Sequence, residues 1–365
     1  MRQLVAYKWK WEKDYMKELV SVVVPIYEQA DYLQVCLASI ANQSYENLEV
    51  LLIDDGSENE EIKEVCDSFC EKDARFIYKN VEHKGVSAAR NEGVKLSTGK
   101  YLIFVDSDDT LYKDRIQKCV TALEDAKEQG KRCCFVLNGM EWIDESAIVS
   151  SKMALFEDRP LLFSFEQNEF VLILWKELFN FVTNKMYKLD VIRKSKISFE
   201  ENMNIAEDLV FNIEYMKADD GDILVVNEPL YRYIHRNENR LSLLYSSNAL
   251  KNTKRAYAQL MRFAMGLGIS SEHKVVICSE FLYNWTARLS AIYKSDSISK
   301  KNRKKLVNTE VRSEEFQNLL ILCWRNKKIS TIRYFTLRTR NFFFYFLLRK
   351  IYLKTIKSFL KSRGR

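Results

Sequence analysis

Short apolar runs alternate with segments of helical periodicity over the first 130 residues of the chain. The apolar runs are rich in β-branched and aromatic residues, which is typical of buried strands; they cover Val20–Ile26, Leu48–Ile53, Arg75–Tyr78 and Tyr101–Val105. The segments between them carry apolar residues at helical spacing; they cover Tyr32–Asn42, Glu60–Glu71, Ser87–Leu96 and Lys113–Gln129. This alternation predicts an α/β domain with a mainly parallel central sheet flanked by helices.

The pattern is less regular beyond residue 130. We expect strands at Phe135–Met140 and Ile223–Asn227 and helices at Glu166–Leu178 and Ala206–Lys217. From Ala249 onward the apolar spacing predicts a mostly helical region, with a polar link at Ser295–Lys305. The expected organisation is therefore an N-terminal extension (1–17), an α/β domain (18–245, with halves at 18–111 and 112–245) and a helical C-terminal region (246–365).

Carboxylates directly follow two of the predicted strands: Asp54 and Asp55 follow the second, and Asp106, Asp108 and Asp109 follow the fourth. In open parallel sheets, ligands bind outside the carboxyl ends of the strands. We therefore expect these side chains to share one rim with Tyr27, which ends the first strand. Like charges this close repel each other, and a divalent cation bound through oxygen would relieve the repulsion.

Each acidic cluster also has a purely structural interpretation. The aspartates from Asp106 onward could cap the helix expected near Lys113, although a cap needs only one carboxylate. Asp55 and Gly56 form an ordinary turn signal. If strand geometry continues, however, Asp106 and Asp108 point the same way and could hold Mg²⁺ or Mn²⁺ between two phosphates. The chain has no GxGxxG and no P-loop, so a phosphate ligand would need such a metal, or Arg and Lys.

The positive charge of the chain is concentrated at its C-terminus. The formal net charge is +7, yet Phe316–Arg365 holds thirteen Lys or Arg and no Asp or Glu. Within this segment Phe342–Leu348 is a run of seven apolar residues, five of them aromatic. A basic, aromatic helix over 342–365 would suit an anionic membrane surface. Alternatively its aromatic side chains pack on the rest of the chain, and both can hold on different faces. No recognisable nucleic-acid-binding module accompanies it, so nucleic acid is not an expected partner.

The chain shows no other sign of membrane insertion or export. No apolar run reaches the roughly eighteen residues of a transmembrane helix, and the first seventeen residues lack a signal-peptide core. The eight cysteines have neither the density of a disulfide scaffold nor zinc-site spacing. We expect a cytoplasmic protein with reduced thiols, either soluble or peripheral on the inner face of the cell membrane.

Four segments in chain order resemble the GT-A nucleotide-sugar domain of family 2 glycosyltransferases. They are Ser21–Tyr27 (SVVVPIY), Leu52–Ser57 (LIDDGS), Gly85–Gly93 (GVSAARNEG) and Phe104–Asp109 (FVDSDD). The resemblance is strong from Glu18 to about Leu111 and continues loosely to about Arg240. It implies a GT-A fold and a metal-dependent enzyme that uses a nucleotide sugar, most simply a UDP-sugar.

The resemblance also implies roles for individual residues. Tyr27 would stack on the base, Glu28 stands where the family often has Asn, and Asp55 would bind the uracil edge. Arg90 lies in the loop and helix that approach the nucleotide, and Asp108 would be the principal metal ligand. The implied donor-binding residues are Pro25, Tyr27, Glu28, Asp55, Arg90 and Asp106, and the implied metal ligands are Asp106 and Asp108.

Two later segments extend the resemblance, and a third carries basic residues after a predicted strand. Ala206–Asn212 (AEDLVFN) is similar to the family's Glu-Asp pair, which implies that Asp208 is the general base; acidic residues at a helix N-terminus are the ordinary alternative. Asn184–Lys188 would shape the acceptor pocket. In Tyr231–Arg236, His235 and Arg236 would contact the diphosphate, or would lie on a solvated edge.

The sequence therefore predicts an inverting glycosyltransferase that moves a sugar to a hydroxyl of a glycan acceptor, which could be lipid-linked, in surface polysaccharide biosynthesis. A protein-glycosylating transferase of the same fold is the close variant. A sugar nucleotidyltransferase should carry a Gly-rich loop with Arg and Lys where this chain has Tyr27–Ala30. A non-catalytic, membrane-bound assembly subunit is the third alternative, and the presence of Asp106, Asp108 and Asp208 argues against it.

Overall fold

The computed structural model describes residues 18–144, 149–153, 161–163, 171, 178–203, 205–235 and 248–349. The chain divides into two compact units. The first comprises the residues up to 237 together with 262–267, and the second comprises 238–261 and the residues from 268 onward. Each unit has its own arrangement of elements.

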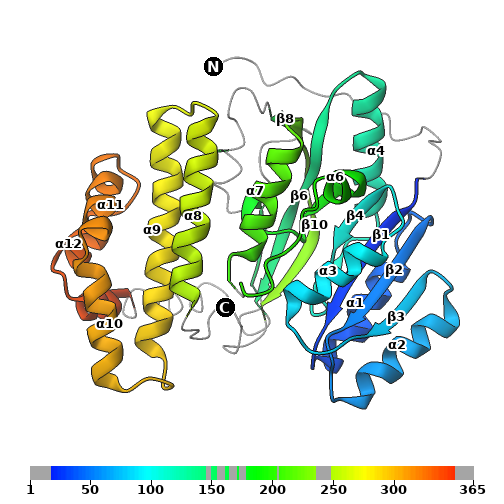
Figure 1. Cartoon of the computed structure of the whole chain (residues 1–365), viewed down its shortest axis with the longest axis horizontal. Helices are drawn as coiled ribbons and strands as arrows, with labels where there is room; N and C mark the ends of the chain where they lie inside the picture. Colours follow the sequence, from blue (N-terminus) through cyan, green and yellow to red (C-terminus); the bar gives the residue numbers. More distant parts are fainter. Residues whose placement is uncertain are drawn as a thin grey trace, which may run out of the picture. The chain divides into compact units, whose positions relative to one another are not determined.

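The first unit is built on a large mixed sheet (Figure 1). Its described strands are β1 (Val20–Ile26), β2 (Leu48–Asp54), β3 (Phe76–Asn80), β4 (Tyr101–Phe104), β5 (Thr110–Leu111), β6 (Cys133–Asp144), β7 (Val149–Met153), β8 (Leu161–Phe163), β9 (Lys185–Lys188) and β10 (Asp222–His235). They follow the order β3-β2-β1-β4-β9-β6-β10-β5, with β7 paired to β6 and β8 paired to β10. The pairs among β1 to β4 and the pair β6–β10 are parallel, whereas β9, β5, β7 and β8 pair antiparallel.

Helices connect these strands and cover the sheet. They are α1 (Ala30–Ala41), α2 (Glu60–Lys72), α3 (Val86–Leu96), α4 (Arg115–Glu128), the 3₁₀ turn η1 (Leu178–Asn180), α6 (Leu189–Lys194) and α7 (Glu207–Ala218). Helix α3 packs on β1 and β2, and α4 packs on β6 and β10. The predicted α/β domain with its parallel β1–β4 core is therefore confirmed. The predicted helix at Glu166–Leu178 lies largely outside the described residues.

Pro25 sits in the central strand β1 without breaking the sheet. Val23 of β1 accepts a hydrogen bond from the backbone of Val105 just beyond β4, and the β1–β4 register ends there, at Val23 and Phe104. Backbone groups two residues apart in a strand face the same neighbour. The missing N–H of Pro25 therefore faces the side on which β4 has already ended, where no ladder bond is lost.

Helix α3 lies unusually close to β1 because of Gly93. A Cβ atom at this position would stand 2.3 Å from Cγ1 of Val23, so no larger residue fits without displacing the strand. Gly93 is one turn beyond Arg90 on the same helix, and both are buried. The close approach thus seats the α3 face that carries Arg90 against the carboxyl half of β1.

The second unit is helical. Its elements are most of α8 (Ala249–Gly266), α9 (Ser271–Lys294), α10 (Lys300–Arg312), α11 (Glu314–Arg325), α12 (Thr331–Arg338) and a last described helix at 342–349. Trp285, Leu289, Phe316, Leu320 and Phe342 are fully buried in its core. No helix among the residues described here combines the length and apolarity needed to cross a membrane.

Serine caps set the starts of these helices. Ser299, Ser313 and Ser330 each accept a hydrogen bond from the backbone N–H three residues on, at the starts of α10, α11 and α12. Such a cap satisfies a donor that the first turn would otherwise leave unpaired. The predicted polar link at Ser295–Lys305 was therefore too long, because Ser299 starts α10 and the following lysines lie within the helix.

Candidate functional site

Three predicted site residues lie at the carboxyl ends of neighbouring parallel strands. Tyr27 follows β1, Asp55 follows β2 and Asp106 lies two residues past β4, in the sheet order β2-β1-β4. The backbone N–H of Asp55 donates to the carbonyl of Ile26 at 2.9 Å, which ties the first two ends together. The expected shared rim is present.

Asp54 and Asp55 hold the loops around this rim. Asp54 is buried and accepts hydrogen bonds from the Tyr78 hydroxyl (2.6 Å), the Asn80 amide (2.9 Å) and the Ser57 backbone (3.0 Å). Burial alone raises the pKa of Asp54, but these bonds outweigh it and lower the pKa. Asp54 therefore stays ionised as a structural anchor of the turn after β2.

Asp55 accepts backbone hydrogen bonds on both oxygens, from Lys84 at 2.9 Å and Gly85 at 2.8 Å. A carboxylate offers about four lone-pair sites, so these two bonds do not use all of them, and Asp55 itself is only 2% exposed. Its Oδ2 also lies 2.9 Å from Nδ1 of His83. The His83 ring stacks on Tyr27, with centroids 4.2 Å apart and planes at 18°. Both rings are substantially exposed, so together they form an aromatic wall beside Asp55.

Sequence reasoning missed His83, because it is a lone histidine outside the resembling segments. Pro25 is buried within β1. Glu28 adopts a positive φ of 52°, and its Oε1 accepts the backbone N–H of Glu58 at 2.6 Å. The base-contact roles of Tyr27, Pro25 and Asp55, and the donor-binding role of Glu28, stay predictions.

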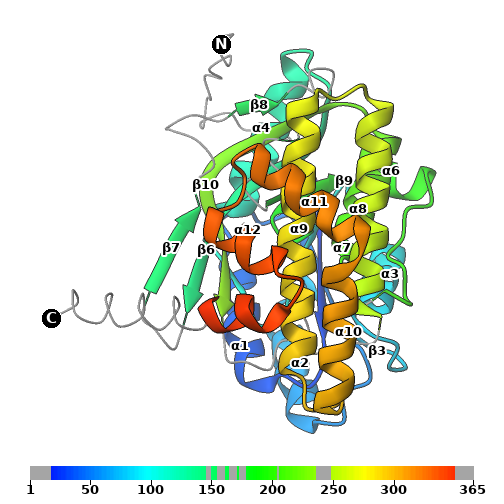
Figure 2. The same ribbon diagram turned by 90° about the vertical axis from the view of Figure 1, so that its left-hand side faces the viewer.

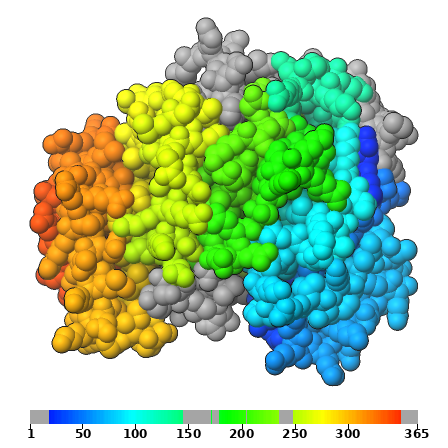
Figure 3. Space-filling view, in the orientation of Figure 1, coloured from blue at the N-terminus to red at the C-terminus, as the bar shows by residue number. Residues whose placement is uncertain are grey.

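Arg90 joins carboxylates that are far apart in the sequence. Its side chain is only 5% exposed, and Nη2 lies 2.9 Å from Oδ1 of Asp106 while Nη1 lies 2.7 Å from Oδ1 of Asp208. Glu207 is the third carboxylate, at 3.6 Å. Figure 3 shows the green surface around α6 and α7 adjoining the cyan surface of α3, which carries Arg90. The guanidinium thus fixes Asp106 and Asp208 to one centre, and its own contact with a nucleotide stays a prediction.

The three aspartates after β4 differ in environment. Asp109 is buried and accepts hydrogen bonds from the Tyr231 hydroxyl (2.6 Å) and the Ile234 backbone (2.9 Å); burial, with Asp108 and Asp106 nearby, raises its pKa well above the usual range. Asp106 and Asp108 are partly exposed. The following helix, α4, begins after Asp114, so the alternative that Asp109 caps it is wrong.

The residues present fit a divalent cation that keeps other ligands. Mg²⁺ is commonly bound by one or two carboxylates together with water and substrate phosphates. Asp106 and Asp108 offer such oxygens, and the single guanidinium of Arg90 faces three carboxylates, leaving a local excess of negative charge. Within the described part of the chain, no group of three or more potential ligands converges as a ready-made metal site.

Glu207 and Asp208 begin helix α7, where Ala206 adopts the left-handed conformation with φ 64° and makes no side-chain cap. Burial raises the pKa of Glu207 to about 7, and the neighbouring Asp208 adds to the rise. Burial also raises the pKa of Asp208, while Arg90 opposes the rise. Oδ2 of Asp208 accepts the backbone N–H of Val182 at 3.2 Å. A partly buried, oriented carboxylate with a raised pKa suits proton transfer.

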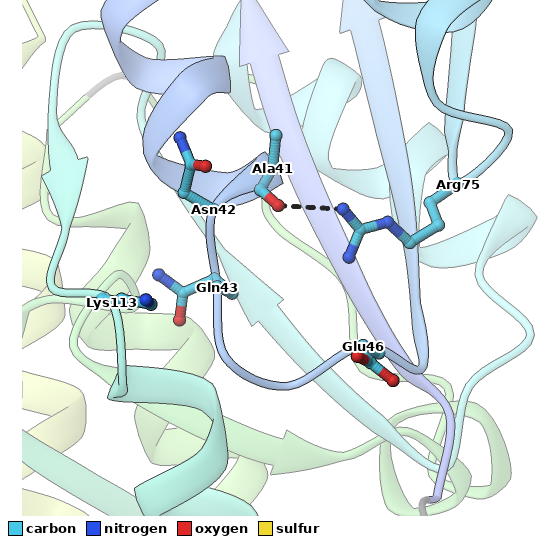
Figure 4. A pocket seen from close by; sticks show the side chains of 6 residues that line it. All are labelled: Ala41, Asn42, Gln43, Glu46, Arg75 and Lys113. Atoms are coloured by element: carbon cyan, nitrogen blue, oxygen red, sulfur yellow. Dashed lines mark hydrogen bonds between the residues drawn. The ribbon is translucent and has the colours of Figure 1, made fainter.

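Asn184 and Lys185 are fully buried, and the role of segment 184–188 in shaping an acceptor pocket stays a prediction. The side chain of His235 and all of Arg236 lie outside the described residues. A separate open hollow is lined by Ala41, Asn42, Gln43, Glu46, Arg75 and Lys113 (Figure 4). It lies by the amino ends of β2 and β3, away from the rim.

The chain is similar in sequence to known glycosyltransferases. Residues 21–195 match the family model described as glycosyl transferase family 2. Glycosyltransferase GlyA of Streptococcus pneumoniae is 25% identical over 350 residues, which are 90% of this chain but 47% of that protein. The chain therefore spans about half the length of GlyA. An uncharacterized glycosyltransferase of Escherichia coli, YibD, is 27% identical over 72% of this chain and 74% of its own length.

Solved structures show the same fold. TarS 1-349 of S. aureus in complex with UDP-GlcNAc superposes with a TM-score of 0.63 at 18% identity, covering 92% of each chain. The predicted GT-A fold is thereby confirmed.

Proposed function

Because residues 21–195 match the family model of glycosyl transferase family 2, we propose that this chain is a metal-dependent, inverting glycosyltransferase. It would move a sugar from a nucleotide donor to a hydroxyl of a glycan acceptor. The observation that carries the proposal is the position of Arg90 between Asp106 and Asp208. Arg90 thereby holds Asp106, at the donor rim, close to Asp208, the candidate base. A displacement between two bound reactants benefits from groups held in fixed positions.

Asp208 would act as the general base. The acceptor oxygen would form a bond to the anomeric carbon while the bond from that carbon to the diphosphate oxygen breaks. The hydroxyl proton would pass to a carboxylate oxygen of Asp208. A single displacement inverts the anomeric centre. Burial of Asp208 supports this role, because a carboxylate with a raised pKa is a stronger base.

Asp106 and Asp108 would hold Mn²⁺ or Mg²⁺, which when bound neutralises a diphosphate leaving group. The chain's own contribution is to keep these two carboxylates accessible while Asp109 is tied to Tyr231 and Ile234. His235 and Arg236 are proposed as further diphosphate contacts. This division of roles accounts for three aspartates in four positions.

A UDP-sugar is the donor that the rim supports best. Tyr27 and His83 offer a stacked aromatic surface for a base, and Asp55 can accept the imide N–H of uracil beside it. The S. aureus TarS structure that shares this fold is a complex with UDP-GlcNAc, which supports the choice of nucleotide but does not identify the sugar used here.

The acceptor is proposed to be a growing glycan, lipid-linked or free, in the assembly of a surface polysaccharide. A protein acceptor is the close variant. Against a sugar nucleotidyltransferase, the loop after β1 offers Glu28 and no Gly-rich, basic turn. Against a non-catalytic assembly subunit, Asp106 and Asp208 are both in place around Arg90.

The basic C-terminal segment, residues 342–365, is proposed to contact an anionic membrane surface on the cytoplasmic side. The described part of this segment is two-faced: Phe342 and Tyr345 are buried against the second unit's core, while Phe343, Phe344, Leu347 and Leu348 are exposed. Helix α12 lies beside it (Figure 2), and Ile332 and Phe335 of α12 are exposed. Arg338 at the end of α12 and Arg340 just after it are also exposed. Apolar side chains next to cationic ones suit an anionic interface.

A thermal-shift screen of nucleotide sugars with Mn²⁺ tests the donor proposal directly. A ligand at a hundred times its Kd stabilises the native state by about 2.7 kcal/mol. For a unit of 150–250 residues this should raise Tm by roughly 5–10 °C. We expect a UDP-sugar with Mn²⁺ to give the largest shift, and turnover to follow with that donor. A preference for another nucleotide would overturn the uridine assignment, and no shift with any nucleotide would overturn donor binding.

A further inference from the structure

Lys185 is a buried cation held by backbone carbonyls. Its side chain is 0% exposed, and Nζ donates to the carbonyls of Leu178 (2.9 Å), Phe179 (3.2 Å) and Phe181 and to Oδ1 of Asn184 (3.0 Å). No carboxylate of the described residues lies within ion-pair distance of Nζ. Desolvating an ammonium is costly unless hydrogen bonds compensate. These hydrogen bonds offset the desolvation of the ammonium, and they fix the backbone of residues 178–181 in one conformation.

Asn212 binds the same stretch of backbone. Its Nδ2 donates to the carbonyls of Phe179 at 2.7 Å and Phe181 at 3.2 Å, while its Oδ1 accepts the hydroxyl of Tyr187 at 2.6 Å. Two buried side chains, one from β9 and one from α7, thus converge on two carbonyls. We call the set formed by Lys185, Asn212 and the backbone of 178–182 the loop clamp.

The loop clamp ends at Asp208. Val182, the next residue along, donates its backbone N–H to Oδ2 of Asp208 at 3.2 Å, and Oδ1 of Asp208 pairs with Arg90. Asp208 and Asn212 are four residues apart on α7 and therefore lie on one face of the helix. Asp208 is thus oriented through one oxygen by a guanidinium and through the other by a backbone donor that the clamp holds in place.

We propose that Lys185 and Asn212 are positioning residues, which act on catalysis by fixing the Val182 N–H that orients Asp208. This inference rests on the proposed role of Asp208 as the base. Without the clamp, the loop at 178–182 would loosen and Asp208 would rotate about its side chain. The contacts that hold Tyr27 and Asp55 at the donor rim would be untouched, because they are made with His83, Lys84 and Gly85 and not with the clamp.

The variants Lys185→Met and Asn212→Ala test the clamp. Their kcat is measured with the sugar donor identified by the thermal-shift screen, and their donor-site affinity is measured with UDP. A misplacement of about 1 Å can cost ~100-fold in rate, so we expect kcat to fall by roughly 10- to 100-fold in each variant. The Kd of UDP with Mn²⁺ should change by less than about threefold, since the rim is intact. Amide hydrogen exchange should quicken in a peptide covering 178–184 and not in one covering 20–26.

Tyr215→Phe is the matched control. Tyr215 lies one turn further along α7 and is equally buried, and its hydroxyl accepts the Lys188 N–H at 2.9 Å and donates to the Cys134 carbonyl at 3.3 Å. Its loss removes buried hydrogen bonds from the same helix without touching 178–182. We expect kcat of Tyr215→Phe to stay within about twofold of the parent, because a comparable loss of stability does not move Asp208.

Combining Asn212→Ala with Asp208→Asn separates an effect on the position of Asp208 from an effect on general stability. If the clamp acts through Asp208, adding Asn212→Ala to Asp208→Asn should lower the residual rate no further, because residues that act as a unit are non-additive. An equal fall in both backgrounds, or an unchanged kcat in Asn212→Ala, would overturn the clamp. If Lys185→Met does not fold, Asn212→Ala still decides. Full activity of Asp208→Asn would instead overturn the proposed base, which is a different failure.

Discussion

Arg90 and Asp208 form a buried ion pair, with 2.7 Å between Nη1 and Oδ1, although they lie on different helices and far apart in the chain. The same guanidinium also binds Asp106 at 2.9 Å. One side chain therefore compensates three carboxylates, with Glu207 the most distant. Removing it would leave three partly buried carboxylates without their shared counter-ion, and the consequences can be measured.

Arg90→Met should lower the free energy of unfolding of the first unit by about 3–5 kcal/mol, the usual cost of removing one partner of a buried ion pair. Chemical denaturation followed by tryptophan fluorescence and circular dichroism gives the value. Lys95→Met on the exposed end of α3 is the matched control; its surface pair should cost no more than about 1 kcal/mol. Equal stability of Arg90→Met and the parent would contradict the pairing.

Glu207 makes stability depend on pH. Its pKa rises from 4.5 to about 7 on folding, with burial as the main cause, so the native state binds a proton that the unfolded state releases. The contribution of Glu207 to the free energy of unfolding is fully present below pH 4.5. It falls by roughly 3 kcal/mol as the pH rises from 4.5 to about 7. Denaturation of Glu207→Gln across this range should show a flatter pH dependence than the parent. Parallel curves for the two proteins would refute the assignment.

Asp108→Asn tests the metal site without disturbing Arg90. Asp108 is partly exposed, so the change should leave Tm nearly unaltered while weakening the metal-dependent step. We expect turnover of the UDP-sugar to fall by at least ~100-fold and the Mn²⁺ concentration for half-maximal rate to rise about tenfold or more. Asp114→Asn, on the helix side of the same segment, is the control. Full metal-dependent turnover in Asp108→Asn would show that Asp108 is not a ligand.

The exposed apolar face of the second unit should govern membrane binding. Flotation of the double variant Phe335→Ser, Phe343→Ser with vesicles containing anionic lipid should be much weaker than that of the parent. Burying each aromatic side chain is worth ~1.5–3 kcal/mol. Added salt should weaken the binding further. The control is Val35→Ser, an equally exposed apolar residue on α1, where Val35 is 57% exposed and Phe335 58%. Unchanged flotation of the double variant, or equal binding to neutral vesicles, would exclude an anionic membrane as the partner.

Much of the rim could be predicted from the sequence, because strand ends are local signals. The runs before Asp55 and Asp106 predict strands, and parallel pairing then places both at one edge. The split between Phe342 and Phe343 in the last helix also follows from helical period, although the sequence left open which face packs.

The contacts that organise the site could not be predicted in this way. His83 reaches Tyr27 only because the loop after β3 folds back over the rim, and a lone histidine carries no such signal. The burial of Lys185 depends on β9 entering the sheet beside β6, where Lys185 pairs with Leu137. The pairing of Arg90 with Asp208 depends on α7 packing near α3, which no local pattern encodes.

The most direct test of the account is the single-turnover rate of Asp208→Asn with a UDP-sugar, Mn²⁺ and a glycan acceptor. A general base contributes about 10²- to 10⁴-fold, so the variant should lose transfer by that factor while binding UDP as tightly as the parent protein. Undiminished transfer at normal donor affinity would show that Asp208 is not the base, and the proposed mechanism would fall.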